Sequence, residues 1–200
     1  MKADTGKCEG ENIMLEIEFK AALTAQQAKE LPEKLLTLGF SGQRAVWEQD
    51  VYFNAPDRDF RKTDEALRLR TVRTLPDGEE QTFITYKGAK LDRASSSRRE
   101  LETGVTSFGT MQALLLALGY RAVFSVRKTR RSVACGAKTV CLDRVDGLGD
   151  FIELETVLPD GTDYETAAAA LLTLLDTLQI PRGALTRKSY LELLMASATV

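Results

Sequence analysis

The segment Glu16-Ile17-Glu18-Phe19-Lys20 alternates charged and apolar side chains. In a β-strand, side chains at i and i+2 point to one face of the sheet, and their neighbours point to the other. The segment therefore predicts a strand with one apolar face and one charged face. Such a charged face usually meets water, but it can also line a site for metal ions or anions.

The same spacing recurs in other segments with strand-like composition, and each pair carries charges of one sign. These pairs are Arg68/Arg70, Glu100/Glu102, Lys128/Arg130 and Glu153/Glu155. Carboxylate oxygens bind hard divalent cations, whereas guanidinium groups donate paired hydrogen bonds to phosphate. If the strands share one sheet, the pairs describe a site for a metal ion and a polyphosphate.

The composition is typical of a soluble globular protein. The chain has 200 residues, of which 44% are hydrophobic and 28% charged, and its net charge is −2. This length suits a single domain, which we place at residues 13–200, after a flexible leader at residues 1–12. We find no signal peptide and no apolar run that could span a membrane, and the three cysteines lack metal-ligand spacing. We therefore expect a cytoplasmic protein with reduced thiols and with neither nucleic acid nor membrane as a partner.

Histidine is absent from the sequence. Its absence excludes a Ser-His-Asp triad, a Cys-His pair and histidine-ligated zinc. The sequence also lacks a P-loop and a GxGxxG motif. Any bound metal ion is therefore expected to be a hard cation held by carboxylates, such as Mg²⁺, Mn²⁺ or Ca²⁺.

The order of predicted elements favours an antiparallel sheet with helices between some strands. The predicted strands are 13–20, 45–53, 66–73, 81–87, 97–103, 122–135, 138–145 and 150–157, and the predicted helices are 24–38, 108–118, 164–178 and 187–196. Leu75-Pro76-Asp77-Gly78 is typical of a hairpin turn, and residues 90–97 of a mobile loop. Because an antiparallel sheet of about eight strands must protect its edges, we predict an α+β fold with a closed eight-stranded antiparallel β-barrel and flanking helices.

A barrel interior that held all these charges would be costly unless acids paired with bases, a ligand entered, or water filled the space. From the sequence alone, each acidic pair is a like-charge cluster. Removal of one glutamate, as in Glu153→Ala, is therefore expected to leave the fold as stable as before or more stable.

With its charged blocks in this order, the chain resembles the CYTH superfamily, the triphosphate tunnel metalloenzymes, and within it the class IV adenylyl cyclases. The resemblance rests on ExExK at Glu16–Lys20 and on the blocks Leu67–Arg70, Tyr86–Gly88, Arg98–Glu102, Lys128–Arg130, Phe151–Glu155 and Ser189–Leu194. It implies a closed barrel that binds a triphosphate together with one or two Mg²⁺ or Mn²⁺ ions.

The resemblance also implies roles for individual residues. Glu16, Glu18, Glu153 and Glu155 would hold metal and, with Lys20, form the catalytic set. Lys20, Arg68, Arg70, Lys87, Arg98, Lys128 and Arg130 would bind phosphate. Glu100 and Glu102 either contact metal or orient a basic side chain, and Asp143 either forms a structural salt bridge or contacts the substrate.

The implied reaction is metal-dependent conversion of ATP to cyclic AMP and pyrophosphate. One alternative is a triphosphatase that hydrolyses inorganic triphosphate or thiamine triphosphate in the same tunnel. A second alternative is a non-catalytic module that binds polyphosphate or a nucleotide. The resemblance also suggests a homodimer. Residues that would recognise a base are not evident in the sequence.

Overall fold

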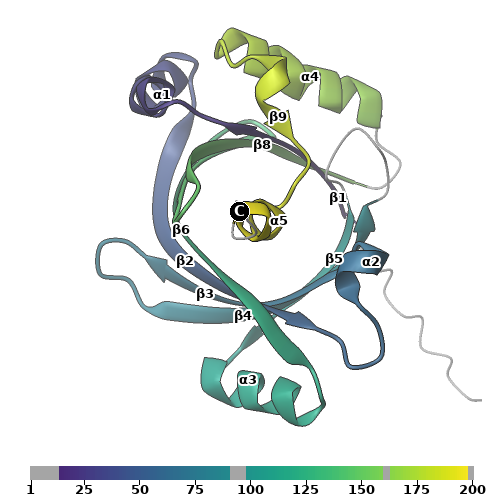
Figure 1. The fold of residues 1–200 in the computed structure, drawn as a ribbon. Helices are drawn as coiled ribbons and strands as arrows, with labels where there is room; N and C mark the ends of the chain where they lie inside the picture. Colours follow the sequence, from purple (N-terminus) through teal and green to yellow (C-terminus); the bar gives the residue numbers. More distant parts are fainter. Residues whose placement is uncertain (1–13, 91–97, 160–162, 198–200) are drawn as a thin grey trace, which may run out of the picture.

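The computed structural model describes residues 14–90, 98–159 and 163–197. Its strands form one nine-stranded antiparallel sheet in the order β5-β4-β3-β2-β6-β7-β8-β1-β9, which curls around a central space (Figure 1). The strands are β1 (Met14–Ala22), β2 (Ser41–Asn54), β3 (Ala66–Thr74), β4 (Glu80–Lys90), β5 (Arg98–Val105), β6 (Arg121–Cys135), β7 (Lys138–Val145), β8 (Gly149–Pro159) and β9 (Leu185–Thr186). The predicted α+β class is confirmed.

Each predicted helix is present, and its bounds agree with the prediction to within a few residues. The helices are α1 (Ala25–Thr37), α2 (Phe60–Thr63), α3 (Phe108–Ala117), α4 (Tyr164–Thr177) and α5 (Tyr190–Ser197), with a 3₁₀ turn at Arg182–Ala184. Thr24 caps α1, since its hydroxyl accepts from the Gln27 N–H while the Gln27 side chain accepts from the Thr24 N–H. The helix continues through Pro32 without a break. Helix α2 and strand β9 were not predicted, because elements this short have no measurable periodicity.

Closure of the sheet into a barrel is not confirmed, and the prediction of eight strands was one too few. Among the described residues, the hydrogen-bonded order begins at β5 and ends at β9, and no ladder joins β5 to β1. Residues of β1 and β5 are nevertheless in contact. The additional strand, β9, pairs with β1 at Lys20 and Ala21 and so occupies part of the edge that a closing strand would use.

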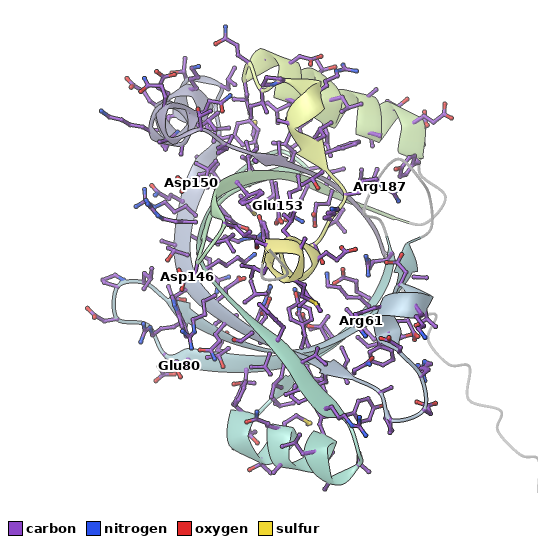
Figure 2. The ribbon with its side chains drawn as sticks, viewed as in Figure 1. Arg61, Glu80, Asp146, Asp150, Glu153 and Arg187 are labelled. Carbon is purple, nitrogen blue, oxygen red and sulfur yellow. The ribbon has the colours of Figure 1, made fainter. Side chains whose placement is uncertain are left out.

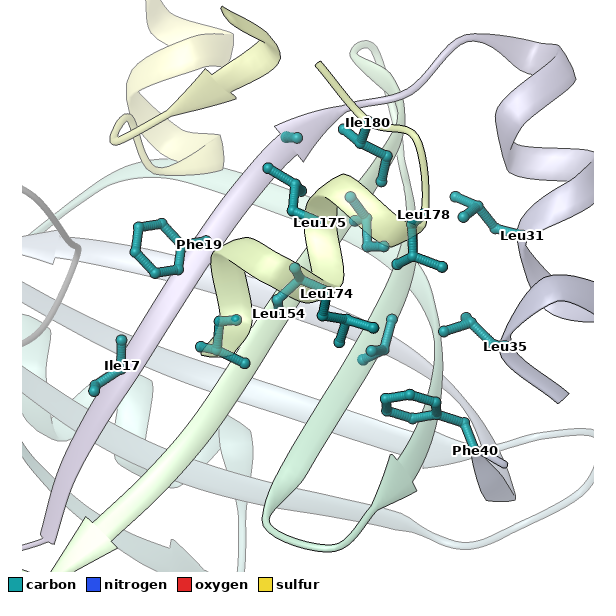
Figure 3. Packing of buried hydrophobic residues seen from close by; sticks show 14 residues of the cluster. Ile17, Phe19, Leu31, Leu35, Phe40, Leu154, Leu174, Leu175, Leu178 and Ile180 are labelled. Carbon is teal, nitrogen blue, oxygen red and sulfur yellow. The ribbon is translucent and has the colours of Figure 1, made fainter. Parts of the chain in front are cut away.

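The curled sheet has an apolar outer face and a charged inner face. Ile17 and Phe19 of β1 and Ile152 and Leu154 of β8 belong to a buried cluster that includes residues of α1 and α4 (Figure 3). A second cluster joins α3 to Leu67 and Leu69 of β3 and the neighbouring strands. Because neighbouring residues of a strand face opposite sides, the charged residues that alternate with these apolar ones point inward.

Helix α5 packs against one part of the inner face. Its first residue, Tyr190, is buried in a cluster with Tyr52, Val126 and Phe151, and Leu191, Leu193 and Leu194 pack against the same cluster. The C-terminal helix therefore lies within the ring of strands that Figure 1 shows. Among the described residues, none of the helices has the length and apolar character needed to cross a bilayer.

Some of the sequence predictions fall on residues that the structure does not describe. The leader at 1–12 lies outside the described residues, as does nearly all of the predicted loop at 90–97. Cys135 and Cys141 are free thiols, as expected. Cys8 lies outside the described residues.

Candidate active site in the charged interior

The inner face of the sheet lines a cavity of about 270 Å³. Side chains from several strands, from α2 and from α5 surround it, and Figure 2 shows Glu153, Arg61 and Arg187 around this interior. Most of the predicted site residues line it: Glu18, Lys20, Arg68, Arg70, Lys87, Arg98, Glu100, Lys128, Arg130, Glu153 and Glu155. The fold therefore brings together charged pairs that are far apart in the sequence.

Of the predicted site residues whose side chains the structure describes, Glu102 alone is not among those that line the cavity, and the position of Glu16 is described only for its backbone. The backbone of Glu16 lies in β1 opposite Val157, but its side chain lies outside the part of the chain that the structure describes. Glu102 is exposed, and its carboxylate accepts a hydrogen bond from Thr85 Oγ1 at 2.7 Å. Its neighbour Glu100 lines the cavity and forms an ion pair with Lys87.

Glu18, Glu153 and Glu155 form a cluster of carboxylates on two paired strands. One oxygen from each of them lies within 4.8 Å of the others. The cluster arises from the antiparallel register of β1 and β8, which places Glu18 opposite Glu155 and Lys20 opposite Glu153. Three converging carboxylate oxygens are the ligand type that Mg²⁺ and Mn²⁺ prefer, so this donor set fits the hard cation expected from the sequence.

The same carboxylates form ion pairs with buried cations. Lys20 Nζ lies 2.8 Å from Glu18 Oε1 and 2.9 Å from Glu153 Oε1, and Arg130 also pairs with Glu153. Burial by itself would lower the pKa of Lys20, but the charges of Glu153 and Glu18 raise it above its usual value. Burial would likewise raise the pKa of Glu153, yet Arg130 and Lys20 hold it well below its usual value. These groups therefore remain charged at neutral pH.

Asp143 is the centre of a second group of ion pairs. Lys128 Nζ lies 3.0 Å from Asp143 Oδ2, and Arg130 donates to both carboxylate oxygens at 2.7 and 2.6 Å. The Tyr190 hydroxyl donates to Oδ2 at 2.9 Å. Burial would raise the pKa of Asp143, but Lys128 and Arg130 lower it. Of the two roles considered for Asp143, the salt bridge is the one present in this structure.

Two buried acids on β2, Glu48 and Asp50, were not among the predicted site residues. Asp50 accepts from Arg70 at 2.6 and 2.7 Å, and Glu48 lies 3.2 Å from Arg70 and 3.3 Å from Lys128. Burial opposes ionisation of Asp50, but Arg70 and Arg68 lower its pKa below the usual value. A signal was available, because Glu48 and Asp50 are a further like-charge pair at i and i+2 within the predicted strand 45–53.

Comparison with known proteins places this arrangement in a family. A model of the CYTH domain matches residues 14–190. The chain belongs to the CYTH domain family. A Methanocaldococcus jannaschii protein named "Putative adenylate cyclase MJ0240" is 36% identical over 180 residues, which are 90% of this chain and 98% of that protein. An Aeromonas hydrophila protein named "Adenylate cyclase CyaB" is 28% identical over 153 residues, 76% of this chain and 75% of that one.

A solved structure has the same fold. PH1819 from Pyrococcus horikoshii superposes with a TM-score of 0.82 and is 35% identical, covering 91% of this chain and 99% of its own. The family assignment predicted from the charged blocks is therefore confirmed.

Three further predicted phosphate-binding cations, Arg68, Lys87 and Arg98, line the cavity. Arg68 lies 3.7 Å from Asp50, and its Nε donates to Thr85 Oγ1 at 3.4 Å. Arg98 lies 3.7 Å from Asp64. Burial and the charge of Arg68 lower the pKa of Lys87, although Glu100 acts in the opposite direction. These side chains come from the adjacent strands β3, β4 and β5, and they line the cavity together with the acids Asp64, Glu65 and Glu100.

Two exposed arginines that line the cavity were not predicted. Arg61 belongs to α2 and pairs with Asp59 at 3.0 Å, and Arg187 precedes α5. Both come from outside the long strands, where the sequence has no alternation to indicate which way a side chain points. Only the folded chain places them at the cavity.

Proposed function

We propose that this protein is a metal-dependent enzyme that binds ATP in the charged cavity and converts it to cyclic AMP and pyrophosphate. The observation that carries the proposal is a single cavity in which a carboxylate cluster lies beside several inward-pointing cations. This is the charge distribution that a triphosphate and its counter-cation require. The names of the two relatives support the choice of a cyclase.

The carboxylates of Glu18, Glu153 and Glu155 would hold one or two Mg²⁺ or Mn²⁺ ions. Glu16, which lies two residues before Glu18 on β1, would contribute a further ligand. A bound divalent cation would supply neutralisation of phosphate charge and a lower pKa for the attacking hydroxyl, which removes the need for a histidine base. Lys20 keeps Glu18 and Glu153 oriented toward a common point, since it contacts both carboxylates.

Arg68, Lys87 and Arg98 would bind the phosphates from one side, and Lys128 and Arg130 from another. In the proposed reaction, the ribose 3′-oxygen attacks the α-phosphorus and its proton passes to solvent. The bond to the oxygen that bridges the α- and β-phosphorus atoms breaks, and pyrophosphate leaves. Positioning and charge neutralisation account for most of the catalysis of such a step.

We also propose that the sheet closes into a barrel between β1 and β5. Contact between residues of these two strands supports closure. A closed sheet would surround the triphosphate and limit the access of bulk water to its phosphorus atoms, which would favour attack by the ribose oxygen over hydrolysis.

The test is to incubate the purified full chain with ATP and either Mg²⁺ or Mn²⁺, and to separate the products by chromatography. We expect cyclic AMP and pyrophosphate in equal amounts, with no product in EDTA. Glu153→Gln and Glu155→Gln should remove activity. Glu80→Gln should retain it, because Glu80 is a surface residue outside the cavity.

Other products would redirect the assignment. ADP or orthophosphate from ATP, or orthophosphate from inorganic triphosphate or thiamine triphosphate, would contradict the cyclase and support the triphosphatase. Tight binding of these compounds without any product would support the binding module.

A further inference from the structure

Tyr190 contacts the charged interior from an element that carries none of the charged pairs. It is the first residue of α5, and its side chain is buried. Its hydroxyl donates to Asp143 Oδ2 at 2.9 Å. Its ring centroid lies 4.7 Å from Lys20 Nζ and 5.2 Å from Lys128 Nζ, so two ammonium groups contact one aromatic ring.

The hydroxyl shares its acceptor with two cations. Asp143 Oδ2 accepts from Lys128 Nζ at 3.0 Å and from Arg130 Nη2 at 2.6 Å, in addition to Tyr190. A carboxylate oxygen has few lone-pair positions, and the fixed direction of the third donor limits how the other two can approach. The Tyr190 hydroxyl therefore restricts the directions from which Lys128 and Arg130 can approach Asp143 Oδ2.

The ring acts on a different pair of cations. The face of an aromatic ring attracts a cation, and the attraction increases where water is excluded. Lys20 and Lys128 come from different strands, β1 and β6, and each is also held by carboxylates. Tyr190 lies against both ammonium groups, and an edge-on contact with Phe151, with ring centroids 5.1 Å apart, fixes the plane of its own ring.

Filling of the apolar cluster does not account for these contacts. A leucine would also pack against Tyr52, Val126 and Phe151, but it would offer neither a donor to Asp143 nor a ring to the lysines. The hydroxyl of Tyr190 and the face of its ring therefore contact charged groups that a leucine could not bind.

We propose that Tyr190 is a positioning residue that holds Lys20, Lys128 and Arg130 in the arrangement that receives the phosphates of the ligand. The inference rests on the proposed function, because it takes these cations to be phosphate-binding. It assigns to α5 a part in ligand binding in addition to its packing against the sheet.

The experiment measures binding of inorganic triphosphate, with and without Mg²⁺, by isothermal titration calorimetry on the full chain. Tyr190→Phe removes only the hydroxyl and should weaken binding about tenfold, as for a hydrogen bond to a charged group. Tyr190→Leu removes the ring as well and should weaken binding about a hundredfold. In assays of turnover, both variants should raise KM more than they lower kcat.

Tyr120→Phe is the control. Tyr120 packs against the outer cluster of α3 and β3, and it is not among the residues that line the cavity. Loss of its hydroxyl should leave triphosphate affinity unchanged. Thermal unfolding of every variant separates loss of fold from loss of affinity, and Tyr190→Phe remains informative if Tyr190→Leu does not fold.

The possible failures are distinguishable. If the wild-type chain binds triphosphate and both Tyr190 variants bind it equally well, Tyr190 only packs and the inference is overturned while the proposed function stands. Tyr190 variants that unfold at a lower temperature but bind triphosphate with unchanged affinity would also overturn the inference. If the wild-type chain binds neither triphosphate nor ATP, the proposed function itself fails.

Discussion

Acids and bases of the inner face form ion pairs between neighbouring strands, and this changes the energetic role expected of Glu153. From the sequence, Glu153 belongs to a repulsive acidic pair. In the structure its carboxylate lies between Lys20 and Arg130, with Lys20 at 2.9 Å. Removing one partner of a buried ion pair leaves a buried charge without a counter-charge. The resulting loss of folding free energy is larger than the gain from relieving the repulsion between the two glutamates.

We therefore expect Glu153→Ala to lower the free energy of unfolding by about 3 kcal/mol, as well as to abolish turnover. Urea unfolding in EDTA measures this without any contribution from metal. Glu155→Ala is the comparison. It should lower the free energy of unfolding by less, because the ion pair of Glu155 with Arg130 is longer, at 3.4 Å. A Glu153→Ala protein as stable as the wild type would instead support the repulsion expected from the sequence.

Arg68 and Arg70 are two residues apart on one strand, but their partners differ. Arg70 is held by Asp50 through two short hydrogen bonds and lies near Glu48, whereas Arg68 is 3.7 Å from Asp50. Arg68→Ala should therefore raise the Kd for triphosphate about tenfold with little change in stability. Arg70→Ala should also destabilise the fold by about 3 kcal/mol, because it removes the two hydrogen bonds that the buried carboxylate of Asp50 accepts from Arg70.

Calorimetric titration together with urea unfolding separates the two effects. Equal losses of stability in both variants would show that the distances do not distinguish their roles. Unchanged triphosphate binding in Arg68→Ala would place that side chain outside the binding site.

At the scale of elements, helices α1 and α4 stabilise the charged interior from outside. They cover the apolar faces of β1 and β8, and so fix the strands whose other faces carry Lys20 and the carboxylate cluster. The alternation along each strand predicted one apolar face and one charged face. The apolar face had to be buried, and the predicted helices were the elements available to cover it.

Leu175 of α4 is fully buried in this outer cluster. Leu175→Ala should lower the free energy of unfolding by about 3 kcal/mol, since it creates a cavity between α4 and the sheet. Leu36→Ala is the control, because Leu36 is 65% exposed, and its change should stay within about 0.5 kcal/mol. Similar values for the two variants in urea unfolding would mean that α4 contributes little to the stability of the sheet.

For the whole molecule, the buried ion pairs predict how stability depends on pH. The pKa values of Asp50, Asp143 and Glu153 are lowered in the folded protein, because nearby cations outweigh the effect of burial. A carboxyl with a depressed folded-state pKa contributes stability that is present above its unfolded pKa of about 4 and is lost at lower pH. Urea midpoints should therefore be nearly constant from pH 7 to 5 and fall steeply below about pH 4.

Asp50→Asn provides the internal comparison for this titration. The variant should be less stable than the wild type at neutral pH, and it should lose less stability on acidification because one of the responsible carboxyls is gone. A wild-type midpoint that stays constant or rises between pH 5 and pH 3 would contradict the assignment of these carboxyls as charged in the native state.

The sequence alone determined the strands, the long helices, the family and most of the charged residues that line the cavity. It could do so because alternation of charged and apolar residues is a local property, and the period of a strand assigns each side chain to a face. The same alternation could have predicted that Glu48 and Asp50 point to the inner face. The short elements α2 and β9 were not, since a few residues carry no period.

Only the tertiary structure decided how these charges meet. Pairing of Lys20 with Glu153, or of Arg130 with Asp143, depends on the register between strands and on the curvature of the sheet, neither of which is encoded within a single segment. Tyr190 reaches Asp143 from 47 residues away in the chain, through the docking of α5. The sequence thus specified which charges enter the interior, whereas folding specified their partners, because contact between distant segments depends on packing of the whole chain.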